Sequence, residues 1–201
     1  MKKGLLIALG VAAVIIIFIL LTVSWGVSVY NRLVSLNEGV NQAWSQVENQ
    51  YQRRYDLIPN LVETVKGVAN FEKETYTAVT EARAKVGQIR ITADQLSDAE
   101  AFQKFQQAQD GLSSALSRLL VVSENYPQLK ANENFLQLQA QLEGTENRIS
   151  VERMKFNQVV QEYNTQIKRF PASIIANMTG FKEKQYFKAA PNAEQAPKVQ
   201  F

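Results

Sequence analysis

The sequence predicts an all-α protein, with an N-terminal transmembrane helix followed by an antiparallel up-and-down four-helix bundle of long, coiled-coil-like helices. Three observations predict it. Residues 4–29 carry no charged side chain. Apolar residues then recur at alternating spacings of three and four, the pattern of helices that pack along a narrow seam. Gly and Pro are scarce before residue 171, whereas Ala, Gln, Glu and Leu, which favour helices, are abundant.

The uncharged stretch is long enough to cross a bilayer as a helix. Residues 5–23 are its densest apolar part, and as a helix they would extend about 29 Å, close to the hydrocarbon thickness of a membrane. Trp25 and Tyr30 follow, where interfacial aromatic side chains are expected. The side chains assigned to the anchor are Leu5, Ile7, Val14, Ile16, Phe18, Leu20 and Trp25.

A cleaved signal peptide is the alternative to an uncleaved anchor. Lys2 and Lys3 would form its positive n-region, but the apolar run is longer than usual and no A-x-A cleavage site follows it. An uncleaved anchor is therefore preferred. Because only Arg32 follows the run before Glu38, the positive-inside rule predicts a cytoplasmic N-terminus with the rest of the chain across the membrane.

Composition excludes several classes of function. Lys and Arg number 22 and Asp and Glu number 19, so the net charge is only +3. That balance lacks the basic surface typical of nucleic-acid-binding proteins, and no nucleic-acid partner is expected. The sequence has no Cys and no His, which excludes thiol nucleophiles, disulfides, Cys/His zinc sites and Ser–His or Cys–His catalysis. No cofactor is predicted.

The first helix of the bundle is expected directly after the apolar stretch. Its seam residues are Leu33, Leu36, Val40, Ala43 and Val47. Pro59 interrupts the pattern, since Pro has no amide hydrogen and disfavours helical geometry at the preceding residue. Either one long helix kinks at Pro59, or two helices meet there with Asp56 capping the second. The second interpretation is preferred because it gives helices of similar length, as in up-and-down bundles.

Turn and capping signals bound the remaining helices. Residues 87–93 predict a connection, and Ser97 with Glu100 predicts a capping box at the start of the next helix, which should end near Ser123. The last long helix is expected over residues 135–170, where eight of eleven seam positions are apolar. These positions follow strict 3–4 spacing and are Phe135, Leu138, Leu142, Thr145, Ile149, Glu152, Phe156, Val159, Tyr163, Gln166 and Phe170. Such a helix must bury its seam against partner helices.

A short apolar turn with Ile174, Ile175 and Met178 is expected before Gly180. The residues after it are rich in Ala, Pro, Asn, Glu and Gln, a composition typical of disorder. The predicted domains are a signal-anchor helix at residues 1–29, a helical bundle at residues 30–187 and a disordered C-terminal tail at residues 188–201.

A series of short motifs, in this order along the chain, resembles the bacterial LemA family. The motifs are AWSQV at 43–47, QRRYDLIPNLV at 52–62, YPQLKA at 126–131, TENRI at 145–149 and FN at 156–157. The resemblance covers residues 30 to about 187. It implies a membrane-anchored, antiparallel four-helix bundle of the bacterial envelope with no settled biochemical activity. It also implies envelope stress and membrane metalloproteases as contexts in which to look for partners.

Two groups of polar residues on different predicted helices are candidates for an interaction. They are Arg53, Arg54, Asp56 and Pro59 in the first bundle helix and Glu146, Asn147 and Arg148 in the last. One hypothesis is that they meet as a buried ion-pair network, which would fix the register of the helices. The alternative is a set of solvated surface charges.

Other candidate residues have plainer interpretations. Trp44, Tyr51 and Tyr55 follow one another at helical spacing and are expected in helix–helix contacts rather than on a ligand platform. Glu146, Glu152 and Asp56 could be proposed as general acids or bases. The sequence offers no nucleophile, metal motif or phosphate-binding loop beside them, so an enzyme is not predicted.

The predicted function is a non-enzymatic scaffold or interaction protein. It would sit in the bacterial cytoplasmic (inner) membrane as a single-pass protein, with the bundle on the periplasmic side. Its expected partners are the lipid bilayer, further copies of itself in a homo-oligomer, and another envelope protein that it holds. The alternative is a ligand- or peptide-sensing regulator of a membrane partner such as a metalloprotease.

Overall fold

The computed structural model describes residues 2–68 and 70–188, without the side chains of Lys2, Lys3 and Leu5. The described residues are almost entirely helical and include no strand, as the predicted all-α class requires. The elements are α1 (Lys2–Lys66), α2 (Lys73–Gln88), the 3-10 helix η1 (Ala93–Ser97), α3 (Ala99–Ser123), α4 (Pro127–Lys130), α5 (Glu133–Lys168) and α6 (Ala172–Thr179). The predicted tail lies, except for Lys188, outside the described residues.

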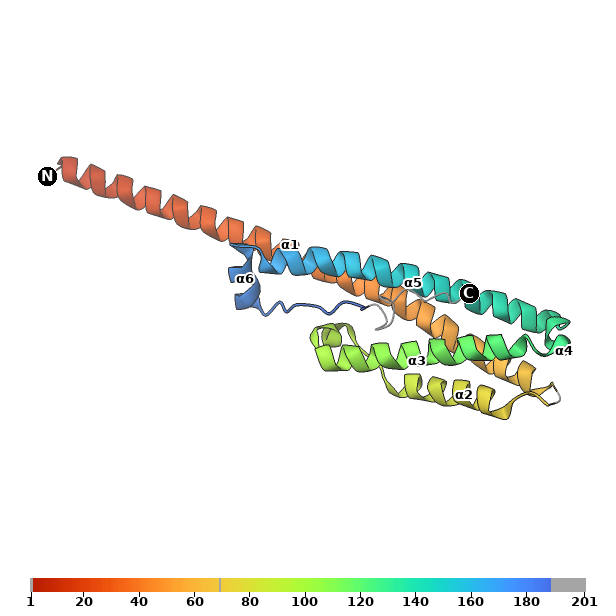
Figure 1. Ribbon diagram of the computed structural model, residues 1–201. Helices are drawn as coiled ribbons and strands as arrows, with labels where there is room; N and C mark the ends of the chain where they lie inside the picture. Colours follow the sequence, from red (N-terminus) through yellow and green to blue (C-terminus); the bar gives the residue numbers. More distant parts are fainter. Residues whose placement is uncertain (1, 69, 189–201) are drawn as a thin grey trace, which may run out of the picture.

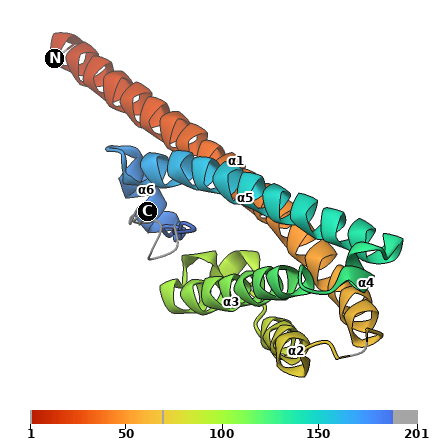
Figure 2. The same ribbon diagram turned by 45° about the vertical axis from the view of Figure 1, so that its right-hand side comes forward.

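The four longest helices alternate in direction, so the predicted up-and-down arrangement is correct (Figure 1). α1 and α5 lie side by side along most of α5, and α2 and α3 form a second antiparallel pair (Figures 1 and 2). α4 shapes the turn between α3 and α5 at the end remote from the N-terminus. α6 lies at the opposite end of the bundle, against α1 and α5.

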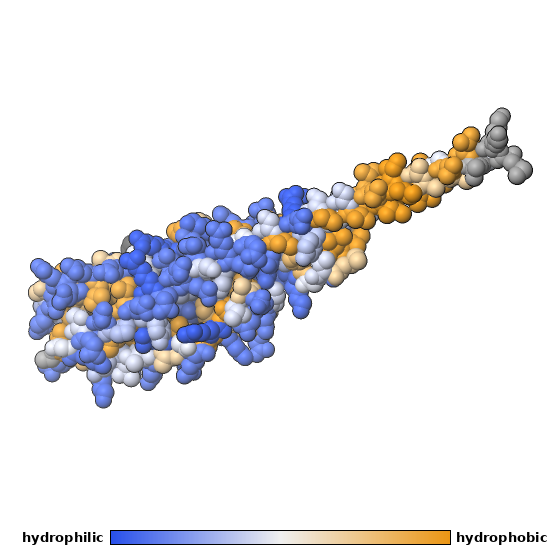
Figure 3. Space-filling view, turned by 180° about the vertical axis from the view of Figure 1, so that it is seen from behind, coloured by the Kyte–Doolittle hydropathy of each residue, from blue (hydrophilic) through white to orange (hydrophobic). Residues whose placement is uncertain are grey.

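α1 extends well beyond the bundle at its N-terminal end (Figure 1). Its apolar part is long and hydrophobic enough to cross a membrane. The space-filling view shows this part as a hydrophobic rod joined to a mainly hydrophilic body (Figure 3). More than half of each of these predicted anchor side chains is exposed: Ile7, Val14, Ile16, Phe18 and Leu20. In a membrane, lipid chains cover such an apolar surface, whereas its exposure to water would be unfavourable.

The predicted helix break at Pro59 is wrong, because α1 continues through this residue to Lys66. A Pro at position 59 leaves the carbonyl of Tyr55, four residues earlier, without its helical amide partner. Arg83 of α2 supplies a replacement: its Nε donates a hydrogen bond to the Tyr55 carbonyl at 3.1 Å. Its guanidinium carbon lies 3.7 Å from the centre of the Tyr55 ring. Asp56 is exposed and accepts a hydrogen bond from Gln52 instead of capping a helix.

The turn between the first two bundle helices comes later than predicted. α1 ends immediately before Gly67, and Asn70 adopts a positive φ of 64°. Asn tolerates this left-handed conformation better than most residues. Because the turn is displaced toward the C-terminus, α2 has only 16 residues and the helices are not matched in length.

The helix ends elsewhere are close to those predicted. The predicted capping box of Ser97 with Glu100 is wrong, because Asp98 is the N-cap of α3 and its carboxylate accepts from the amides of Glu100 and Ala101. α3 ends at Ser123 as expected. α6 ends at Thr179 and is followed by Gly180, whose φ of 80° gives the left-handed conformation common after a helix.

The core of the bundle consists of two hydrophobic clusters, one after the other along its length. The cluster nearer the anchor contains Leu33, Val40, Trp44, Val47, Tyr51, Ile91, Leu96, Phe102, Phe105, Ile149, Phe156, Val160, Tyr163, Ile167, Ala176 and Phe187. The cluster farther from it contains Ile58, Leu61, Val62, Val65, Phe71, Val79, Leu112, Leu116, Leu119, Leu129, Phe135 and Leu142. What lies between the two clusters is polar.

Candidate functional site

A buried polar layer separates the two hydrophobic clusters, and Arg54 is its centre. In α1 it lies between Tyr51 of one cluster and Ile58 of the other. Its side chain is completely buried, with 0% of its surface exposed. Since an unpaired charge in such a place is very costly, its surroundings must supply partners.

Three side chains from two other helices surround the Arg54 guanidinium. Its Nη1 donates to Glu146 Oε1 of α5 at 2.8 Å and to Ser113 Oγ of α3 at 2.6 Å. Its Nη2 donates to the side-chain oxygen of Gln109, also in α3. Ser113 Oγ in turn donates to Glu146 Oε2 at 3.0 Å, which closes the network. The layer therefore ties α1, α3 and α5 together at one level of the bundle.

A second ion pair lies nearer the anchor. Nη2 of Arg153 in α5 is 2.9 Å from Oδ1 of Asp110 in α3, and its Nε donates to the hydroxyl of Tyr51 at 2.6 Å. Burial raises the pKa of Tyr51 to about 12, although the nearby positive charges of Arg153 and Arg54 oppose that rise. Tyr51 therefore stays a neutral phenol at any physiological pH. Each ion pair joins two helices, and the hydrogen bonds beside it reach the third, so that both layers connect α1, α3 and α5.

The structure brings only part of the predicted residue set together. Arg54 and Glu146 meet, whereas Arg53, Asp56, Asn147 and Arg148 are exposed. Pro59 is exposed too.

Trp44, the remaining residue of the predicted set, lies elsewhere in the core. Only 1% of its surface is exposed, and its ring contacts four others at centroid distances of 5.4–6.1 Å. Those rings belong to Phe102, Phe105, Phe156 and Phe187. Trp44 is thus a helix-packing residue, as its spacing suggested.

Sequence reasoning missed four residues of the two polar layers, namely Gln109, Asp110, Ser113 and Arg153. A feature of the sequence could have predicted one of them, Gln109. Gln109 lies at a seam position of α3, between the apolar seam residues Phe105 and Leu112. A polar residue in an otherwise apolar seam needs a polar partner on the facing helices.

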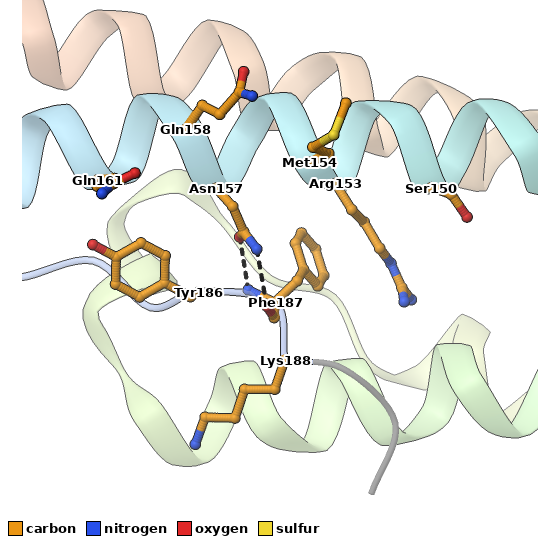
Figure 4. Close-up of a pocket in the computed structure, with 9 residues that line it drawn as sticks. All are labelled: Ser150, Arg153, Met154, Asn157, Gln158, Gln161, Tyr186, Phe187 and Lys188. Atoms are coloured by element: carbon orange, nitrogen blue, oxygen red, sulfur yellow. Dashed lines mark hydrogen bonds between the residues drawn. The ribbon is translucent and has the colours of Figure 1, made fainter. Parts of the chain in front are cut away.

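The segment after α6 returns along the bundle as an extended chain held by side-chain amides. Asn157 of α5 donates to the carbonyl of Phe187 and accepts from its amide, both at 2.9 Å (Figure 4). Asn164 binds the carbonyl and amide of Lys184 in the same way, also at 2.9 Å. Gln106 of α3 makes the equivalent pair with Lys188. These bonds fix the backbone of the segment against α5 and α3.

Two open pockets border these features. One, of about 470 Å³, lies beside the extended segment and is lined by Arg153, Met154, Asn157, Tyr186 and Phe187 among others (Figure 4). The other, of about 540 Å³, lies between α1 and the end of α2 and reaches Tyr51 and Gln109 of the polar layers. Among the described residues, no cluster of three or more acidic side chains could hold a metal ion.

The chain is similar in sequence to a known protein family and to several named proteins. A model of the LemA family matches residues 43–201. Over 178 residues the chain is 29% identical to magnetosome protein MamQ of Magnetospirillum gryphiswaldense and 28% identical to magnetosome protein MamQ 1 of Paramagnetospirillum magneticum. Each alignment covers 81% of this chain but 65% of the relative, so the chain spans slightly less than two thirds of these relatives.

A third relative carries the family's own name. Protein LemA of Metamycoplasma hominis is 25% identical over 179 residues, which cover 87% of this chain and 78% of that protein. The family match includes all of the bundle beyond the first seam residues, with α2, α3, α5 and α6 and both polar layers. The chain is a member of the LemA family.

Proposed function

We propose that the protein is a non-enzymatic scaffold of the bacterial cell envelope, which holds a rigid helical bundle at a fixed place above the membrane. The observation that carries this proposal is the continuity of α1, a single helix of 65 residues from the apolar segment to the far end of the bundle. The part after Val29 is about 55 Å long. No flexible linker lies between membrane segment and bundle within α1.

The polar layers support a structural role for the bundle. Arg54 and Arg153 bind α1, α3 and α5 to one another in a defined register. A buried ionic layer adds little net stability but can select a single arrangement of helices. A fixed arrangement suits a protein that presents a surface to partners, whether further copies of itself or another envelope protein.

We place the protein in the cytoplasmic membrane with the bundle on the periplasmic side. Lys2 and Lys3 precede the apolar segment, and Arg32 is the only basic residue that follows it before Glu38. The positive-inside rule favours that orientation.

The mass of the assembly tests the scaffold proposal. Full-length protein, extracted from membranes in a mild detergent, would be measured by size-exclusion chromatography with light scattering beside a fragment beginning at Tyr30. A discrete oligomer that requires the membrane segment is the expected result. A monomer in both samples would contradict self-assembly, and crosslinking in cells would then test whether a different protein is held.

A ligand- or peptide-sensing regulator is the second candidate, favoured by one observation. The pocket of about 540 Å³ opens directly onto Tyr51 and Gln109, which contact the buried Arg layers. A ligand there could alter the packing of α1 and so the position of a membrane partner, such as a metalloprotease. Binding of a ligand that shifts the fluorescence of Trp44, but not in a Gln109→Leu variant, would support this candidate.

A further inference from the structure

α6 carries two of its three large apolar side chains, Ile174 and Met178, on the side away from the bundle, whereas Ile175 packs against the core. Ala172 and Ala176 are its buried residues. Ile174 and Met178, which alternate with them, are 49% and 79% exposed. Positions two apart lie on nearly opposite faces of a helix. A helix at the surface of a soluble bundle has the reverse arrangement, with large apolar residues inside.

The exposed apolar surface continues before the helix. Phe170 is 78% exposed, although its place on the predicted seam of the last helix should have buried it. Phe170, which lies just before α6, and Ile174 and Met178 within it are three large, exposed apolar side chains in a stretch of nine residues. No residue of α6 is charged. Such a surface needs a partner that is itself apolar.

The position of α6 identifies that partner. A Cβ atom added to Gly26 of α1 would lie 3.7 Å from Ile175 Cδ1, so α6 packs against α1 at this level. Gly26 follows Trp25 and lies three residues beyond the dense apolar segment that ends at Val23. Three helical residues correspond to about 4.5 Å. The headgroup layer on each side of a bilayer is roughly 5–7 Å thick, so α6 is level with it when α1 spans the membrane.

Charged and aromatic residues at the ends of α6 fit the same location. Lys168, Arg169 and Lys182 are exposed just before and just after it. One acidic residue, Glu183, is among them and pairs with Lys168. Next to them Phe181 packs against Tyr30, with ring centroids 6.0 Å apart. Apolar residues bordered by basic and aromatic side chains are characteristic of helices that lie in a membrane interface.

We propose that residues 170–179 form a second membrane contact, which lies in the interface of the bilayer that α1 spans. Phe170, Ile174 and Met178 enter the boundary of the acyl chains, and the neighbouring basic residues contact anionic headgroups. With α1 as its only contact, the bundle could rotate about the helix axis and tilt. The second contact fixes one face of the bundle toward the membrane.

Labels at single cysteines in the full-length protein test this proposal, since the natural chain has no Cys. Spin labels would be placed at Ile174→Cys and Met178→Cys. The matched controls are Val121→Cys on α3 and Met154→Cys on α5, whose native side chains are 65% and 55% exposed but lie away from α6. Each variant would be reconstituted in vesicles of phosphatidylethanolamine and phosphatidylglycerol in a roughly three-to-one ratio.

Collision rates with membrane-soluble oxygen and with a water-soluble nickel complex then report the depth of each label. We expect oxygen to dominate at positions 174 and 178 and nickel to dominate at positions 121 and 154. Equal access of nickel at all four positions would overturn the proposal. Exclusion of both reagents at position 178, together with dipolar coupling between labels on different copies, would also overturn it, because a second copy would then cover this surface.

Lipid composition separates the apolar from the ionic part of the proposal. Replacing phosphatidylglycerol with phosphatidylcholine removes the anionic headgroups but leaves the acyl chains. The label at position 178 should become shallower, with a measurable loss of its oxygen-to-nickel ratio, and the label at position 121 should not change. An unchanged depth at position 178 would refute the role given to the basic residues.

Discussion

Arg54 lies at the centre of the buried polar layer and is bonded to side chains of two other helices. Replacing it with Met removes a charge but leaves Glu146, Gln109 and Ser113 without their common partner. Breaking a buried ion pair on one side costs about 3–5 kcal/mol, and because 35% of the Glu146 side chain is exposed to water the lower end, roughly 3 kcal/mol, applies here. We expect Arg54→Met to lower the free energy of unfolding by about that amount, measured by urea denaturation of the full-length protein in detergent.

Arg53 offers a matched control for this change. It is the same residue type in the same helix, but it is exposed. Arg53→Met should alter the free energy of unfolding by less than about 0.5 kcal/mol. Adding Glu146→Leu to Arg54→Met should restore part of the loss, since an apolar pair can replace a buried ion pair. Equal effects of Arg53→Met and Arg54→Met would show that the layer does not hold the helices together.

Tyr51 predicts how the bundle responds to alkaline pH. Its pKa is about 12 in the folded protein and about 10 in an unfolded chain, so the folded state keeps the phenolic proton longer. The contribution of the protonated phenol to the free energy of unfolding is complete below pH 10 and is lost as the pH rises toward 12. The loss is about 1.4 kcal/mol per pH unit in this interval.

Tyr51→Phe removes the titrating group and keeps the ring. Urea denaturation between pH 9 and pH 11.5 should therefore show that wild-type protein loses stability more steeply than Tyr51→Phe above pH 10. The titrations of the lysines and of the other tyrosines affect the free energy of unfolding of both proteins, so they cancel when the two curves are subtracted. Parallel curves for the two proteins would mean that Tyr51 is not held in its neutral form by the fold.

The sequence allowed part of the polar layer to be predicted, and the helical period explains which part. Tyr51, Arg54 and Ile58 continue the first seam, whereas Arg53 and Asp56 point elsewhere on the helix. Of the predicted group Arg53, Arg54, Asp56 and Pro59, only Arg54 lies on the seam by this spacing. Asp110 and Arg153 could not be selected, because charged residues are common along amphipathic helices and only the packed bundle shows which of them meet.

α1 is a helix that continues through Pro59, although proline usually ends or kinks a helix. Local rules at Pro59 predict a break, but they do not include a donor from another helix. Arg83 of α2 supplies one, and contacts in the core on both sides of Pro59 keep the chain helical. The interaction is tertiary, so no reading of the residues around Pro59 could have found it.

A double-mutant cycle tests this explanation. Arg83→Met should lower the free energy of unfolding by about 1–3 kcal/mol, because it leaves the Tyr55 carbonyl without a partner. In a Pro59→Ala background the amide of residue 59 can bind this carbonyl, and the same Arg83 change should cost about 1 kcal/mol less. Lys85→Met, at an exposed position of α2, is the control. Strictly additive effects of Pro59→Ala and Arg83→Met would contradict the replacement of one donor by the other.

α5 departs from its predicted seam because a straight helix drifts relative to a heptad repeat. Phe135, Leu142, Ile149 and Phe156 are buried at predicted positions. After Phe156, Tyr163 is still buried as predicted, but positions 160 and 167 are buried instead of 159 and 166. An α-helix has 3.6 residues per turn, so a repeat of 3.5 falls behind by about 20° every heptad. The shift was hard to foresee because residues 159 and 160 are both Val.

The whole molecule combines a membrane segment, a register-locked bundle and a terminal segment that returns along it. α1 joins the first two without interruption, and α6 packs against it near Gly26, just after the apolar segment. The fold class and the alternating helix directions could be predicted from seams and turns. The outward apolar face of α6 could not, because the sequence of a short apolar helix does not say which side packs on the bundle.

The continuity of α1 in the membrane-bound protein is the claim from which the scaffold proposal derives. It can be measured as one distance, by pulsed electron resonance between spin labels at Ser35→Cys and Glu63→Cys in vesicles, since both positions are exposed on α1 and lie on either side of Pro59. Because the two positions are 28 residues apart in sequence, an unbroken helix predicts a single narrow distribution at ~42 Å. A broad distribution, or a main distance below about 30 Å, would show that the chain turns or hinges between them and that the bundle is not held at a fixed height.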